Sequence, residues 1–330
     1  MIISKTPYRI SFFGGGSDYP EWYNKFGGQV ISSTINKYLY ISCRELPDFF
    51  VHKYRVVYSK IEEVKKISDI KHKVVKLALL EKKIQKNLEI HYDGDLPSRS
   101  GMGSSSSFVV GLLSALNEFN NIKLDKLSLA KESVNFEQKI LRECVGSQDQ
   151  IACSVGGFNS IVFNQEGAFK INKIDNDKKF QKKLIKNLVL LYTGKQRTAA
   201  MIAKKFVNII STSKKNELRS ILECVSLAKG MISKMQIDEF GLLLDESWKI
   251  KKKLHKNISN TDIDNFYDLG KKNGALGGKI LGAGGGGCLL FYVPLEKRDF
   301  FLKKMDFLTY IPFEFENYGT QIIFNSNKKN

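Results

Sequence analysis

A short glycine- and serine-rich segment is the first part of this sequence that could do chemistry. Residues 96–116 read LPSRSGMGSSSSFVVGLLSAL, and a run of four serines stands directly before an apolar stretch. Because the apolar residues recur at helical spacing, we expect a helix to begin at the serines. A helix N-terminus carries unpaired N–H groups and positive partial charge, glycine lets the backbone approach a ligand, and serine hydroxyls can bind Mg²⁺. The segment predicts a cradle for a phosphate chain, with an ordinary serine-capped loop as the alternative.

Two better-known phosphate-binding patterns do not fit the chain. The P-loop pattern GxxxxGK[ST] does not occur in it. A literal GxGxxG is present at Gly282, Gly284 and Gly287, but the apolar run that follows at 288–293 predicts a strand. A dinucleotide-binding loop leads into a helix, so this interpretation fails its structural context.

The elements that must position these segments can be expected from hydrophobic periodicity. Residues 1–60 carry β-branched and aromatic residues between turn signals, which predicts strands. Helices are expected at 108–119 and at about 126–142, the second with Asp125 as its N-cap. Further amphipathic helices are expected at about 198–211, 217–235, 238–255 and 262–273.

Length and composition indicate two globular domains. The chain has 330 residues, of which 42% are apolar. A polar, lysine-rich stretch at 172–186 marks the boundary, which predicts an N-terminal domain at 1–172 and a C-terminal domain at 187–330. The apolar runs are strand-sized and the N-terminus lacks an apolar signal block, so we expect a cytoplasmic protein without membrane spans. Five scattered cysteines without a CxxC pair argue against a disulfide framework or a zinc ribbon.

The net charge of +18 at pH 7 has two interpretations. One is nucleic-acid binding. However, the lysines are dispersed through segments such as 178–186 and 249–256, without interleaved aromatic residues. We therefore interpret them as solvated helix faces and expect no nucleic-acid partner, although the positive field would attract an anionic substrate.

Three motifs in order resemble those of one superfamily of kinases. The segment LPSRSGMGSSSS resembles the second motif, Pro-x-x-x-Gly-Leu-Gly-Ser-Ser-Ala, of the galactokinase, homoserine kinase, mevalonate kinase and phosphomevalonate kinase (GHMP) superfamily. TPYRISFFGGGSDYP at 6–20 is similar to its first motif, and KILGAGGGGCLLFY at 279–292 is similar to its third. The resemblance implies a two-domain α+β fold, with a half like ribosomal protein S5 domain 2 followed by a ferredoxin-like half. It also implies ATP and Mg²⁺ as cofactors.

The resemblance also implies roles for residues at matching positions. Asp149 would accept or orient the acceptor hydroxyl, and Arg9 would stabilise charge on the transferring phosphoryl group. Glu137, which lies twelve residues before Asp149, would bind Mg²⁺ together with Ser105. The nucleotide would be bound by Gly101, Met102, Gly103, Ser104, Ser105, Ser106, Gly284 and Gly285.

The first motif bears on the acceptor. Galactokinases carry Gly-Glu-His-Thr-Asp-Tyr there, whereas this chain reads Gly-Gly-Gly-Ser-Asp-Tyr at 14–19 and so lacks the Glu-His pair but keeps the aspartate that binds sugar hydroxyls. With GSQDQIACSVGGFN and LYTGKQRTA, it resembles the D-glycero-D-manno-heptose 7-phosphate kinase subgroup. Those enzymes make the 1,7-bisphosphate of the GDP-heptose pathway, which serves surface polysaccharides. Fucokinase and galactokinase types stay open as alternatives.

The substrate in this interpretation is a small-molecule sugar phosphate. The residues expected to bind it are Gly16, Ser17, Asp18, Gly157 and Arg197, with Lys195 and Arg99 as weaker candidates for the substrate's own phosphate and Arg55 and His72 weaker still.

Other classes of function fit less well. A serine hydrolase would need a GxSxG elbow, which the chain lacks. A sugar-binding regulator without catalysis would not need Arg9, Glu137 and Asp149 together. The sequence leaves a monomer and a homodimer equally open.

Overall fold

The sheet that carries Arg9 is the larger of two in this computed structural model, which describes residues 1–174, 178–195 and 199–326. Its continuous path runs in the order β13-β1-β2-β5-β3-β4; β12 and β6 also pair with β2, and β7 pairs with β6. Residues at alternate positions, such as Leu39, Ile41 and Cys43 on β2, are fully buried, so one face of the sheet belongs to the core. The strands are β1 (Ile2–Phe13), β2 (Gly28–Glu45), β3 (Tyr54–Val57), β4 (Ile61–Val64), β5 (Leu88–Gly94), β6 (Phe158–Phe163), β7 (Phe169–Lys173), β12 (Phe315–Glu316) and β13 (Gln321–Asn325).

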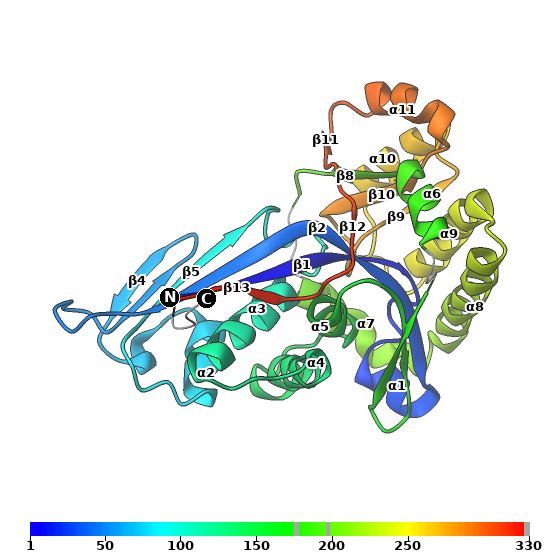
Figure 1. Ribbon diagram of the computed structural model, residues 1–330. Helices are drawn as coiled ribbons and strands as arrows, with labels where there is room; N and C mark the ends of the chain where they lie inside the picture. The colour runs from blue at the N-terminus through cyan, green and yellow to red at the C-terminus, as the bar shows by residue number, and fades with distance from the viewer. Residues whose placement is uncertain (175–177, 196–198, 327–330) are drawn as a thin grey trace.

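Helices cover the buried face of this sheet (Figure 1). The central one is α3, which packs against both β1 and β2, and α2, α4 and α5 lie around it. The helices of this half are α1 (Pro20–Phe26), α2 (Lys73–Glu81), α3 (Ser104–Phe119), α4 (Lys126–Asn135) and α5 (Gln148–Val155), with a short 3₁₀ turn at Ile67–Asp69.

The second half is built around a four-stranded antiparallel sheet in the order β11-β8-β10-β9. Helices separate β8 from β9, and α11 separates β10 from β11, which is the connectivity of a ferredoxin-like fold. The expected α+β class with a ferredoxin-like second half is therefore confirmed. The elements are β8 (Leu188–Tyr192), α7 (Ala199–Ile210), α8 (Lys215–Ser233), α9 (Ile237–Lys252), α10 (Thr261–Lys272), β9 (Gly277–Ile280), β10 (Cys288–Tyr292), the 3₁₀ turn Leu295–Lys297, α11 (Arg298–Lys304) and β11 (Thr309–Tyr310).

Local expectations about the helices hold in part. Asp125 is the N-cap of α4, since its Oδ1 accepts the N–H of Ser128 at 2.7 Å. The helix expected at about 126–142 is present as a helical segment at 126–140, but α4 ends at Asn135 and the segment continues as a π-helix at Phe136–Ile140. The lysine-rich boundary segment contains a further helix, α6 (Lys179–Asn187), whose apolar side packs into the core.

The two halves are joined by more than the connecting chain. The N–H of Cys288 on β10 donates to the carbonyl of Ser100 at 2.9 Å. After the ferredoxin-like unit, β12 pairs with β2 and β13 pairs with β1, so the last strand lies beside the first (Figure 1). The division at 172–187 stays a prediction, and these last strands hydrogen-bond to the first sheet.

A buried carboxylate ties the outer face of the first sheet together. Glu89 on β5, with 3% of its side chain exposed, accepts hydrogen bonds from Arg44, Arg55 and His91. Burial alone would raise its pKa, but these hydrogen bonds outweigh that effect and lower the pKa of Glu89 to about 2. Among the residues described, no helix is both long and apolar enough to cross a bilayer.

Candidate active site

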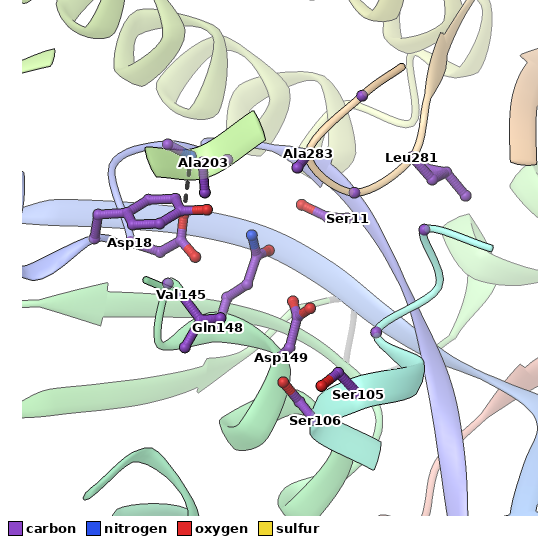
Figure 2. Close-up of a pocket in the computed structure, with 18 of the residues that line it drawn as sticks. Ser11, Asp18, Ser105, Ser106, Val145, Gln148, Asp149, Ala203, Leu281 and Ala283 are labelled. Carbon is purple, nitrogen blue, oxygen red and sulfur yellow. Dashed lines mark hydrogen bonds between the residues drawn. The ribbon is translucent and has the colours of Figure 1, made fainter. Parts of the chain in front are cut away.

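A cavity of about 340 Å³ lies where the two halves meet. It is lined by β1, by the glycine- and serine-rich segment, by residues 137–149, by α9 and by the glycine run after β9. Figure 2 shows Asp149 close to Ser105 and Ser106, with Ser11 on another side of the same pocket. Segments that are far apart in the sequence, and that were each expected to act on phosphate, therefore meet in one place.

Arg9 and Asp149 form a bidentate ion pair at the cavity wall. Arg9 Nε donates to Asp149 Oδ1 at 2.6 Å, and Arg9 Nη2 donates to Asp149 Oδ2 at 2.5 Å. The third nitrogen, Nη1, donates to the carbonyl of Gly101 at 2.8 Å. Only 4% of the Arg9 side chain is exposed, whereas 22% of the Asp149 side chain is. The forked geometry fixes the orientation of both groups and leaves the carboxylate as the member that a ligand can reach.

The start of α3 faces this ion pair. Gly103 is the N-cap residue with a φ of +79°, and a Cβ there would lie 3.2 Å from Arg9 Cγ and 3.4 Å from Asp149 Oδ2. Glycine is therefore needed both for the backbone conformation and for the space. The first-turn residues Ser104, Ser105 and Ser106 all line the cavity, where free N–H groups of a helix attract anions.

Two of the residues expected to bind the nucleotide, Met102 and Gly285, use their backbone groups for hydrogen bonds within the protein. Met102 is fully buried in the core, and its carbonyl accepts the N–H of Arg9 at 3.1 Å. Gly285 donates its N–H to the carbonyl of Ile258 at 2.8 Å and does not line the cavity, whereas Gly284 does.

The glycine run at 282–287 packs directly on the serine-rich segment. A Cβ on Gly101 would lie 2.6 Å from the carbonyl oxygen of Leu281, and one on Gly282 would lie 2.9 Å from Gly101 Cα. A Cβ on Gly287 would lie 2.3 Å from the carbonyl oxygen of Ser100. We call this backbone-to-backbone packing of 100–101 against 281–287 the loop contact. It explains the glycines on both sides, because no side chain fits between the two loops.

Glu137 is the residue most suited to a cation. Its Oε2 accepts hydrogen bonds from Ser106 Oγ at 3.0 Å and from the amide of Gln150, while its Oε1 is buried without a hydrogen-bond partner among the described residues. Burial raises the pKa of Glu137 to about 8. A free carboxylate oxygen beside a hydroxyl suits Mg²⁺, so the residues present fit that ion. The hydroxyl in contact is that of Ser106, whereas Ser105, expected from the sequence, is exposed.

The residues expected to bind the acceptor are only partly gathered in the cavity. Asp18 and Gly16 line it, and Asp18 Oδ1 accepts the N–H of Gly16 at 2.9 Å. Burial raises the pKa of Asp18. Ser17 Oγ instead lies within hydrogen-bond distance of the carbonyls of Gly14 and of Gln29 on β2. The N–H of Gly157 donates to Thr34 Oγ1 at 2.8 Å, away from the cavity.

The candidates for binding the substrate's own phosphate lie in different parts of the molecule. Arg197 lies outside the described residues. Lys195 pairs with Asp262 and does not line the cavity, whereas Arg99 does line it. Arg55 belongs to the ion-pair network on the outer face of the sheet, and His72 caps α2 through its Nδ1.

Two lysines of the cavity were missed by the sequence analysis. Lys251 on α9 donates from Nζ to the carbonyl of Gly282 at 2.6 Å, and Lys279 on β9 donates to the carbonyl of Phe12 at 2.7 Å. Lys251 comes from the lysine run interpreted as a solvated face, and that interpretation is wrong for this residue. Lys279 opens the third motif, but nothing in its type or spacing showed that it would be buried.

Comparison with known proteins decides the family. The model of the GHMP kinases N terminal domain matches residues 70–157, and the model of the GHMP kinases C terminal domain matches residues 226–307. The chain belongs to the GHMP kinase family. This kinase is 28% identical over 312 residues to D-glycero-alpha-D-manno-heptose 7-phosphate kinase of Campylobacter jejuni, a match that covers 90% of this chain and 91% of that one.

Two further comparisons, one with a related sequence and one with a solved structure, agree with this family. The kinase is 25% identical over 327 residues to L-fucokinase/L-fucose-1-P guanylyltransferase of Bacteroides fragilis, which covers 88% of this chain but only 34% of that protein. Its fold matches the crystal structure of a D-glycero-D-manno-heptose 1-phosphate kinase from Bacteroides thetaiotaomicron with a TM-score of 0.81 at 22% identity, over 98% of this chain and 99% of that one. As a GHMP kinase, the protein transfers phosphate from ATP.

Proposed function

We propose that this kinase phosphorylates the anomeric hydroxyl of D-glycero-D-manno-heptose 7-phosphate in the cytoplasm. The product would be the 1,7-bisphosphate used for GDP-heptose and surface polysaccharides. The observation that carries the proposal is the Arg9–Asp149 ion pair beside the start of α3, inside a cavity that also presents Asp18. The similarity over nine-tenths of the chain to the Campylobacter jejuni enzyme supports the choice of heptose 7-phosphate.

The mechanism follows from where these groups lie. The acceptor oxygen attacks the γ-phosphorus of ATP, the bond to the β–γ bridging oxygen breaks, and ADP leaves with that electron pair. Asp149 orients the hydroxyl and accepts its proton. Arg9, held by both carboxylate oxygens, keeps Asp149 in place and adds positive charge where the phosphoryl group passes.

The phosphate chain of ATP would be held by backbone rather than by side chains. The first turn of α3 supplies N–H groups, and the loop contact keeps the approach free of Cβ atoms. Glu137 and Ser106 would hold Mg²⁺, which neutralises charge on the phosphates when bound. The side chain of Asp18, buried at the cavity wall, would accept hydrogen bonds from hydroxyls of the sugar.

A sugar kinase of the fucokinase or galactokinase type is the alternative, because a fucokinase relative is similar over 88% of this chain. An assay with Mg-ATP and heptose 7-phosphate, fucose and galactose would separate the candidates, with the new phosphate located by ³¹P and ¹H NMR. We expect turnover of heptose 7-phosphate with phosphate at C1. Turnover of an unphosphorylated sugar at equal or higher kcat/KM would replace heptose 7-phosphate by that sugar.

A further inference from the structure

Two lysines of the cavity, Lys279 buried and Lys251 half-buried, have no acidic ion-pair partner among the described residues. Lys251 and Lys279 each donate from Nζ to a backbone carbonyl, of Gly282 and of Phe12 respectively. Within the parts of the chain that the structure describes, neither forms an ion pair. An ammonium group carries three donors, so each lysine keeps donors for something else.

The lack of a directly paired counter-charge has an energetic consequence. Burial, together with the charge of Arg9, lowers the pKa of Lys251 to about 8, although the more distant charges of Asp18 and Asp149 act to raise it. Burial lowers the pKa of Lys279 as well, and the charge of Lys251 adds to the effect. A cation removed from water is costly unless an anion pairs with it. An anion placed against both ammonium groups would offset that cost, so the pair is suited to bind one.

The position of the lysines favours the acceptor over the nucleotide. The nucleotide side of the cavity already has a cation in Arg9, the N-terminus of α3 and a metal site at Glu137. On the acceptor side, Ser11 Oγ and Gln148 Oε1 are buried in the cavity wall without partners among the described residues.

These unpartnered groups lie next to the lysines and to the expected sugar-binding aspartate. Ser11 directly precedes Phe12, whose carbonyl holds Lys279. Figure 2 shows Gln148 between Asp18 and Asp149, with its amide end pointing toward Ser11. A ligand on this side of the cavity could therefore form hydrogen bonds with Ser11 and Gln148 through its hydroxyls. The ammonium groups of Lys251 and Lys279 could bind an anionic group of the same ligand.

We propose that Lys251 and Lys279 bind a phosphate carried by the acceptor itself, separate from the phosphoryl group that is transferred. The proposal rests on the proposed function, because it requires a sugar phosphate in this cavity. The proposal places the binding site for the acceptor's own phosphate at Lys251 on α9 and Lys279 on β9. Lys195, a candidate from the sequence, instead pairs with Asp262.

Kinetics with two acceptors test this assignment. The variants are Lys251→Met, Lys279→Met and the control Lys252→Met, whose lysine is next in α9 but pairs with Asp264 at 3.0 Å outside the cavity. The acceptors are D-glycero-D-manno-heptose with and without its 7-phosphate. For the phosphorylated acceptor we expect Lys251→Met and Lys279→Met to lower kcat/KM by about 10- to 100-fold, which is the usual effect of losing a hydrogen bond to a charged group. The loss should come from a higher KM for the acceptor.

The reaction with the unphosphorylated acceptor and the activity of the control variant should be nearly unchanged. Turnover of unphosphorylated heptose, the KM for ATP and the Lys252→Met enzyme should change by no more than about twofold. Equal losses of kcat with both acceptors would assign the lysines to the transferred phosphoryl group and overturn the proposal. If Lys279→Met does not fold, as judged by its melting temperature, Lys251→Met alone decides, since its lysine contacts only a loop carbonyl.

A binding measurement separates this proposal from the proposed function. If the wild-type enzyme phosphorylates none of the sugars, the proposed function fails. The anion site is then tested by the rise in melting temperature caused by inorganic phosphate, with a non-hydrolysable ATP analogue present to fill the nucleotide site. Wild type and Lys252→Met should be stabilised and Lys251→Met should not. Equal stabilisation of all three, or of none, would refute the anion site.

Discussion

The loop contact makes a sharp prediction about Gly101. An alanine there keeps a φ of +82°, which strains a residue with a Cβ by about 1 to 2 kcal/mol. Its Cβ would also lie 2.6 Å from the carbonyl oxygen of Leu281, a backbone atom that can move only if a loop moves. Overpacking of this kind adds about 1 to 3 kcal/mol, so we expect Gly101→Ala to destabilise the fold by about 2 to 5 kcal/mol in all.

Gly101→Ala should also lower kcat/KM, by more than its loss of stability alone would cause. The Gly101 carbonyl accepts a hydrogen bond from Arg9, so a displaced loop moves the phosphate-binding backbone relative to the ion pair. A misplacement of about 1 Å can lower the rate about 100-fold. We expect a loss of that size in kcat/KM, measured by ADP release below the melting temperature of the variant.

Gly194 offers a matched control for this prediction. It has a φ of +71°, but a Cβ there would have no atom of the described residues within 4 Å. Gly194→Ala therefore introduces the backbone strain without the collision, and we expect a destabilisation of about 1 to 2 kcal/mol with kcat/KM nearly unchanged. If the two variants had equal melting temperatures and equal activities, strain alone would account for Gly101 and the reasoning about the loop contact would be wrong.

Three further outcomes are expected. Asp149→Asn should lower kcat by at least about 1000-fold while ATP binding, followed by calorimetry, stays within a few-fold of wild type; an active variant would remove Asp149 from the chemistry. Asp125→Ala should destabilise the protein by about 1 kcal/mol in urea unfolding without changing kcat, because it removes only the cap of α4. Glu89→Gln should lower the free energy of unfolding by about 2 kcal/mol at pH 7. Since the pKa of Glu89 is lowered on folding, this difference should be constant above about pH 4.5 and shrink as the pH falls toward 2; a constant difference would show that its partners do not stabilise the charge.

What the sequence could predict was mostly local. The serine run at the start of α3 and the cap at Asp125 act through neighbours in the chain, so residue type and spacing carry the information. The glycine run was recognisable by residue type, but its packing against residues 100–101 is a contact between distant parts of the chain. The pairing of Arg9 with Asp149 was reached only through resemblance to a family, because the two residues are 140 positions apart and nothing local requires them to meet.

The parts that were missed depend on orientation and tertiary packing. In the run 249–256 five of the eight residues are lysines, three of them consecutive, so periodicity could not show that Lys251 turns inward while Lys252 pairs with Asp264. Glu137 lies in the π-helix that follows α4, an irregularity that hydrophobic periodicity does not show, and its carboxylate contacts Ser106 rather than the expected Ser105.

The pairing of β13 with β1 has a consequence for how the protein is made. The edge of the strand that carries Arg9 lacks its neighbour until residues 321–325 leave the ribosome, roughly 15 to 60 s after β1 at ordinary rates of translation. An unpaired edge can join with another chain during that interval. Early synthesis therefore leaves the nascent protein open to aggregation at the strand that carries Arg9, until β13 pairs with that edge.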